Sequence, residues 1–173
     1  SAGSSSGPSA PAGTAMPSAS SSSKTVKRPA VVTAVDVSKV YGDADPVLRV
    51  TTSGFTPADA LTITLSATRA AGENVGSYSI TNGTINALGG TAAGNYTASL
   101  STTGNTLAVT AKSVTGTIAN QTKVYGADDP TLSGIGVTLG GVVNRTASTW
   151  NGNVAINDTG NVTATLASLV RGT

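Results

Sequence analysis

The sequence predicts an all-β protein in which small antiparallel β domains follow a disordered N-terminal tail. Several short segments alternate between apolar and hydroxyl-bearing residues, turn-forming residues separate them, and no stretch has the apolar spacing of an amphipathic helix. The clearest alternation is at residues 61–65, where Leu61, Ile63 and Leu65 would share one face of a strand. Sandwich-like and β-grasp-like topologies both fit this pattern.

The tail and the predicted elements follow in order along the chain. Residues 1–29 are mainly Ser, Ala, Gly and Pro, which offer too little apolar surface to fold and therefore predict a disordered linker. Thr56 and Pro57 suit the start of a helix of a turn or two. Asn82-Gly83 predicts a hairpin turn between strands at residues 78–80 and 84–85. Further strands are expected at residues 31–37, 61–65, 95–100, 107–112, 113–118, 135–139, 154–156 and 162–166.

A sequence of eight residues occurs twice, as KVYGDADP at residues 39–46 and as KVYGADDP at residues 123–130. We call these copies the first and second turn motifs. Their separation is that of one small domain, which predicts two modules, residues 30–112 and 113–173. No flexible linker joins the modules, so a stiff rod is expected. The positions shared by the copies are Lys39, Val40, Tyr41, Gly42, Asp45 and Pro46, and Lys123, Val124, Tyr125, Gly126, Asp129 and Pro130.

The shared residues suit a structural turn. An Asp before Pro, as at Asp45 and Asp129, favours a tight turn because its carboxylate accepts backbone N–H groups and the proline fixes φ. The glycine after each tyrosine suits a left-handed backbone conformation. Tyr41 and Tyr125 are expected to pack at a domain end with their hydroxyls hydrogen-bonded. Calcium binding is the weaker interpretation, because the carboxylates are spaced differently in the two copies.

Composition excludes several classes of function. The chain has no Cys and no His, which rules out disulfides, thiolate nucleophiles, imidazole bases and His/Cys metal sites. No catalytic residue, cofactor or metal is therefore predicted, and the chain is not expected to be an enzyme. The net charge of +2 arises from Lys24, Lys27 and Arg28 within the predicted tail, so nucleic acid is not an expected partner. Because no apolar run approaches roughly 20 residues, membrane insertion is not expected either.

Two kinds of surface residue are candidates for contacts outside the chain. Trp150, with Arg145 nearby, is the candidate ligand contact, because aromatic and Arg side chains dominate binding surfaces. Asn-x-Ser/Thr sequences are candidate glycosylation sites, although a chain so rich in Ser and Thr also produces them by chance. The four candidates are Asn82, Asn120, Asn144 and Asn157.

Five separated segments occur in an order that resembles a known family. They are residues 39–46, 69–78 (RAAGENVGSY), 80–84 (ITNGT), 94–97 (GNYT) and 107–110 (LAVT). Together they resemble the MBG domain of the YGX type, a mostly-β repeat of bacterial adhesins and filamentous-haemagglutinin-like exoproteins. The resemblance implies a secreted or cell-surface bacterial protein, often exported by two-partner secretion, and it implies no catalytic residues.

The second module departs from this pattern. It keeps the turn motif, but a longer segment separates Tyr125 from Arg171 than separates Tyr41 from Arg69. The stretch ending at Arg171 is the expected counterpart of the stretch ending at Arg69. Counterparts of residues 72–76, 95–97 and the closing strand at 107–110 are missing, so the module is either cut short or a variant closer to the related YDG repeats. Residues 113–173 are therefore expected to fold less stably than residues 31–112, with unpaired strand edges.

The repeat and the resemblance together predict a structural function. The chain is expected to be a non-catalytic stalk or spacer of a large secreted bacterial surface adhesin, with neighbouring repeats of the same chain as its partners. Two alternatives stay open: an adhesive module that binds a host glycan or host protein directly, and an accessory domain of a secreted enzyme.

Overall fold

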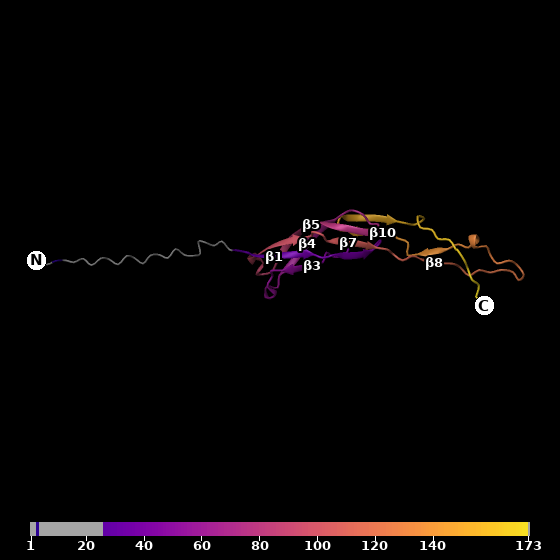
Figure 1. Ribbon diagram of the computed structural model, residues 1–173, viewed down its shortest axis with the longest axis horizontal. Coiled ribbons are helices and arrows are strands. Elements are labelled where there is room, and N and C mark those ends of the chain that lie inside the picture. Colours follow the sequence, from indigo (N-terminus) through magenta and orange to yellow (C-terminus); the bar gives the residue numbers. More distant parts are fainter. Residues whose placement is uncertain (1–2, 4–25, 173) are drawn as a thin grey trace.

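The computed structural model describes residues 3 and 26–172, so most of the predicted disordered tail lies outside the described residues. The described chain is all-β, which confirms the predicted fold class (Figure 1). No helix among these residues has the length and apolar character needed to span a membrane. The strands are β1 (Arg28–Ala34), β2 (Val37–Val40), β3 (Val50–Ser53), β4 (Thr62–Arg69), β5 (Gly76–Gly89), β6 (Tyr96–Ser101), β7 (Thr106–Thr110), β8 (Thr115–Thr117), β9 (Thr138–Gly140), β10 (Asn144–Thr149) and β11 (Gly152–Asn157). Within the described residues, three 3-10 turns cover Pro57–Asp59, Ala93–Asn95 and Leu132–Gly134.

The first module consists of two small mixed sheets. Their strand orders are β3-β1-β6 and β2-β7-β5-β4. β1 is followed by β2 along the chain, and β6 is followed by β7. The second pair of strands runs parallel to the first, with β6 beside β1 and β7 beside β2. β1 pairs with β6 from Arg28↔Tyr96 to Thr33↔Ser101, and β2 pairs with β7 from Val37↔Leu107 to Val40↔Thr110. The sheets are therefore mixed, whereas only antiparallel pairing was expected.

The core of the first module is small and built from alternating side chains. Ala30, Val32 and Ala34 of β1 are buried, while the residues between them are exposed. Leu107 and Val109 of β7 are also buried, and they too alternate with less buried residues. Each buried Val or Leu contributes about 1.5–3 kcal/mol, so this core is modest for a domain of its size. Contacts outside the apolar core therefore have to contribute to stability.

The hairpin predicted at Asn82-Gly83 is wrong. β5 runs without interruption from Gly76 to Gly89 and pairs along β4, with Gly83 opposite Ala67. A Cβ on Gly83 would lie 2.6 Å from a side-chain carbon of Leu100. Close approach of β6, and not a turn, therefore requires glycine at this position. The pairing with β4 outweighs the local Asn-Gly turn preference.

The second half of the chain forms two separate strand pairs. β8 pairs with β9, and β10 and β11 form a hairpin with Thr149 opposite Gly152. The strand predicted at residues 162–166 is wrong: these residues are irregular and no strand pairs with them. Figure 1 shows β8 at the end of the molecule remote from β1, whereas β10 lies over the first module. The hairpin belongs to the predicted second module, residues 113–173, and its tip contacts the first module.

Candidate functional site

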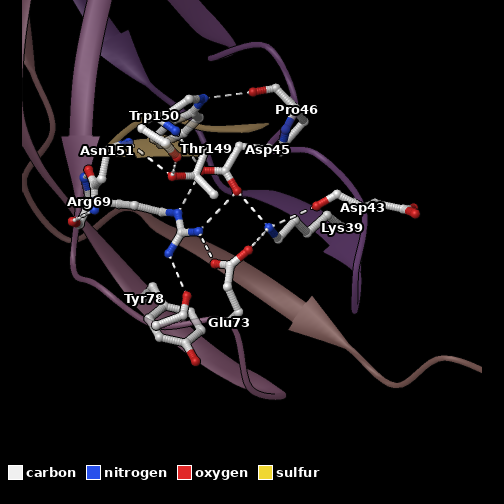
Figure 2. A network of polar contacts seen from close by, with 12 residues as sticks. Lys39, Asp43, Asp45, Pro46, Arg69, Glu73, Tyr78, Thr149, Trp150 and Asn151 are labelled. Carbon is white, nitrogen blue, oxygen red and sulfur yellow. Dashed lines mark hydrogen bonds and ion pairs between the residues drawn. The ribbon is translucent and has the colours of Figure 1, made fainter. Parts of the chain in front are cut away.

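Four charged side chains meet at the end of the first module that faces the hairpin (Figure 2). We call Lys39, Asp45, Arg69 and Glu73 the Arg69 network. Lys39 Nζ lies 2.8 Å from Asp45 Oδ1 and 2.6 Å from Glu73 Oε1. Arg69 donates from Nε to Asp45 Oδ2 at 2.7 Å and from Nη2 to Asp45 Oδ1 at 3.0 Å, and it also pairs with Glu73. Two cations and two carboxylates therefore alternate around a ring of contacts.

Strand geometry explains how these charges come to be buried. Lys39 occupies an inward position of β2, two residues after buried Val37. Arg69 is the last residue of β4 and lies on the same face of the strand as Ile63 and Leu65, so strand alternation points its side chain inward. The side chains of Lys39, Asp45 and Arg69 are at most 2% exposed, and that of Glu73 is 10% exposed. Charges buried to this degree are stable only when they are paired and hydrogen-bonded.

Backbone carbonyls complete the hydrogen bonding of the cations. Lys39 Nζ donates to the Asp43 carbonyl at 3.0 Å. Arg69 Nη1 donates to the carbonyls of Ala70 at 3.0 Å and Gly72 at 2.8 Å. The Arg69 guanidinium also lies 5.3 Å from the centre of the Tyr78 ring, within cation–π range. Within the described part of the chain, every buried side-chain nitrogen and oxygen has a hydrogen-bond partner.

The surroundings hold both Asp45 and Arg69 in their charged forms. Burial acts to raise the pKa of Asp45, but hydrogen bonds from Arg69, Lys39 and the Trp150 N–H outweigh it and leave the pKa below its ordinary value. Burial acts to lower the pKa of Arg69, yet Asp45 and Glu73 raise it above its ordinary value. Asp45 and Arg69 are thus ionised at neutral pH, and the network has a structural character.

The β10–β11 hairpin binds to this network with its tip. Trp150 donates from its backbone N–H to Asp45 Oδ2 at 3.0 Å and from Nε1 to the Pro46 carbonyl at 2.8 Å. The Asn151 side chain accepts from the Arg69 N–H at 3.1 Å and donates to the Arg69 carbonyl at 2.7 Å. The Trp150 ring packs on the cluster of Val37, Leu107 and Val109. Polar and apolar contacts therefore join the hairpin to the first module at one place.

Tyr41 forms a second contact between the modules. Its hydroxyl donates to Asp158 Oδ2 at 2.7 Å, and its ring packs on the hairpin-side cluster of Val143, Ala147 and Ile156. The hydrogen bond to Asp158, followed by burial, raises the pKa of Tyr41 above its ordinary value. Gly42 has φ +88°, as expected, and a Cβ there would lie 2.7 Å from the Val143 side chain. The packing expected for Tyr41 is confirmed.

The second turn motif has the same local structure but is uncovered. Lys123 Nζ lies 2.6 Å from Asp129 Oδ1 and donates to the Ala127 carbonyl at 3.1 Å. Gly126 has φ +81°, as expected. Tyr125, however, is fully exposed, so the packing predicted for this tyrosine is wrong. Among the described residues no second hairpin covers this motif.

The structure places the other sequence candidates on the surface or at the interface. Both N–H groups of Trp150 are used by Asp45 and Pro46, which leaves the residue no free donor for a ligand. Arg145 is exposed, with Nη1 3.9 Å from Asp43 Oδ1. No three acidic side chains gather into a metal site in the described part of the chain. The candidate glycosylation sites Asn82, Asn120, Asn144 and Asn157 are all exposed.

Sequence comparison adds one finding to this geometry. Residues 30–108 match the family model described as MBG domain (YGX type). The match contains all four members of the Arg69 network and ends before the second turn motif. Neither a curated protein nor a solved structure matches the chain.

Proposed function

Because residues 30–108 are an MBG domain (YGX type), a domain typical of bacterial surface proteins, we propose that the chain is a non-catalytic spacer of a secreted bacterial adhesin. In this function the modules hold an adhesive region away from the cell and transmit tension along the chain. The family that matches is a non-catalytic one, and the Arg69 network consists of charges that satisfy one another without leaving a reactive group.

The observation that carries the proposal is the parallel pairing of the first two strands of the module with its last two, β1 with β6 and β2 with β7. The chain enters the module at the start of β1 and leaves it at the end of β7, which is the opposite end. β1 and β2 run side by side with β6 and β7 in the same direction. Tension applied before β1 and after β7 therefore pulls neighbouring strands past each other along their length. In this shear geometry the ladder hydrogen bonds resist together, whereas strands pulled apart from one end break their bonds one at a time.

Single-molecule pulling tests the proposal directly. The chain has no Cys, so introduced cysteines define the attachment points. The pair Val26→Cys and Lys112→Cys loads the module in shear. The pair Val26→Cys and Asn95→Cys lies at the same ends of β1 and β6 and peels them apart. All three positions are exposed, so the substitutions leave the core unchanged.

The expected result is a clearly higher unfolding force for the shear pair than for the peeling pair at the same loading rate. Equal forces, or a lower force in shear, would show that the parallel strands bear no load and would overturn the spacer proposal. Thermal unfolding of both variants without load is the control, because it should give the same stability for the two.

A further inference from the structure

We propose that the second turn motif is a docking site for a β-hairpin of a neighbouring repeat in the same polypeptide, with an aromatic residue and an Asn at the hairpin tip. The inference rests on the spacer function proposed above and names its molecular partner. The visible precedent is the first turn motif, on which Trp150 and Asn151 of the following module are seated.

The two turn motifs share their backbone and ionic geometry. The Asp43 N–H donates to the Val40 carbonyl at 3.0 Å, and the Ala127 N–H donates to the Val124 carbonyl at the same distance. In both motifs the lysine bonds the carbonyl four residues later and pairs with the Asp that precedes the proline. The second motif therefore repeats the backbone turn and the Lys–Asp pair on which the hairpin is seated in the first motif.

The arginine of the first interface also has a counterpart. Arg171 Nη1 lies 3.7 Å from Asp129 Oδ1, so Lys123 and Arg171 flank Asp129 as Lys39 and Arg69 flank their shared carboxylate. Both cations reach the same oxygen of Asp129, whereas Asp45 also accepts the Trp150 N–H on Oδ2. A docked hairpin would supply this third donor.

These charges line one side of a cleft whose other side is apolar. Its volume is about 570 Å³, and its apolar lining includes Ile118, Leu132, Ile135, Leu169 and Val170. In the first module a cluster of this character receives the Trp150 ring. The second motif itself exposes two apolar side chains, Tyr125 at 103% and Val124 at 78% relative exposure. An aromatic hairpin tip matches this combination of an apolar cleft and a charged rim.

The first experiment extends the full chain with its own sequence. A copy of residues 70–158 is placed directly after Arg171, so that a copy of Glu73 follows this arginine by the native spacing and a copied Trp-Asn hairpin follows the second module. The matched control carries Ala in place of the copied Trp and Asn. Hydrogen exchange of the original residues 123–130 is measured by NMR in the native chain and in both extended chains. Segmental isotope labelling of the native part keeps the copy of these residues in the extension out of the spectra.

We expect exchange at residues 123–130 to slow by about tenfold or more in the extended chain and to return to the native rate in the control. Linking the hairpin in cis raises its effective concentration, so a weak contact is also detected. Unchanged exchange beside a folded extension would overturn the proposal. Protection in the native chain alone that grows with protein concentration would also overturn it, because a second copy of the chain would then be the occupant.

A second experiment does not depend on folding of the extension. The isotope-labelled native chain is titrated with a cyclised peptide of residues 142–157, and the control peptide carries Trp150→Ala. We expect chemical-shift changes at residues 123–130 and 169–171 with the first peptide alone, and none in an Asp129→Asn chain. No change, or changes confined to the first turn motif, would overturn the proposal.

These outcomes are separable from those of the spacer proposal. A second motif that stays uncovered leaves the shear resistance of the first module intact, and a module without shear resistance can still dock a hairpin. The pulling and docking measurements therefore fail independently.

Discussion

The charged side chain of Asp45 bonds to both modules. Its carboxylate accepts hydrogen bonds from Lys39 and Arg69 of the first module and from the Trp150 N–H of the hairpin. Removing one member of a buried ionic cluster leaves the others without compensation, which costs more than the pairing itself contributes. The turn predicted from the Asp-Pro sequence is therefore also the centre of the interface.

Substituting Asp45→Asn should destabilise the chain by about 3–5 kcal/mol, because two buried cations lose their shared carboxylate. Urea unfolding followed by circular dichroism measures this loss. The control is Asp43→Asn, whose carboxylate is exposed and lies 3.9 Å from Arg145, and which should change stability by less than about 0.5 kcal/mol. Equal effects of the two substitutions would contradict the assigned role of the Arg69 network.

The lowered pKa of Asp45 sets the sign of the acid dependence. A carboxyl group with a depressed folded-state pKa contributes stability that is fully present above its unfolded pKa of about 3.9 and is lost as pH falls through the folded value. Denaturation midpoints measured between neutral pH and pH 2 should therefore fall in the acid range. This part of the acid dependence should disappear in the Asp45→Asn chain.

Tyr41 gives the opposite dependence at high pH. Its raised pKa means that the neutral phenol is favoured in the folded chain, so its contribution is fully present below the unfolded value of about 10 and is lost as pH rises through the folded value. Alkaline titration should loosen the hairpin, and Trp150 fluorescence reports this change. The Tyr41→Phe chain should not show the transition at the same pH.

At the scale of elements, the β10–β11 hairpin is attached mainly through its tip. Trp150→Ala removes the indole hydrogen bond and the ring contact with Val37 and Leu107. Because the ring is half-buried, the attachment should weaken by about 2–3 kcal/mol, less than for a fully buried Trp. Hydrogen exchange should accelerate in residues 144–157 and stay unchanged in β1 and β6. Arg145→Ala, on the exposed side of the same hairpin, is the control.

Strands in which apolar and polar residues alternate are predictable from the sequence. Strands that lack this pattern and form only by pairing with a neighbouring strand are not. Leu107 and Val109 identify β7 from sequence, as Val154 and Ile156 identify β11. β10 has a single buried residue, Ala147, so it carries no apolar pattern and was missed. β3 was missed for the same reason, since it has no buried side chain.

The candidate site was only half visible in the sequence. The repeat identified Lys39 and Asp45, and the family resemblance included Arg69 and Glu73 within residues 69–78, but neither indicated a shared ionic cluster. Four charges concentrated in such motifs, in a chain with only 10% charged residues, were the available signal. The role of Asn151 had no such signal, because its hydrogen bonds to Arg69 link residues 82 positions apart.

At the scale of the whole molecule, the interface changes the path of force. While the hairpin stays attached to the first module, tension applied at the C-terminal side enters that module at two places. One is the Asp158 contact with Tyr41, and the other is the hairpin tip, through Trp150 and Asn151. Residues 113–143, including β8 and β9, then lie outside the loaded path as a shielded segment. Figure 1 agrees with this arrangement, since β8 extends away from the body on which β10 lies.

Pulling the full chain between Val26→Cys and Gly172→Cys tests this coupling most directly. We predict a step before the first module unfolds, in which the hairpin detaches and releases the shielded segment of about 30 residues, or about 100 Å of extended chain. Trp150→Ala should lower the force of this step and leave the later unfolding of the first module unchanged. A record without this step, or a step whose force Trp150→Ala does not change, would contradict the account.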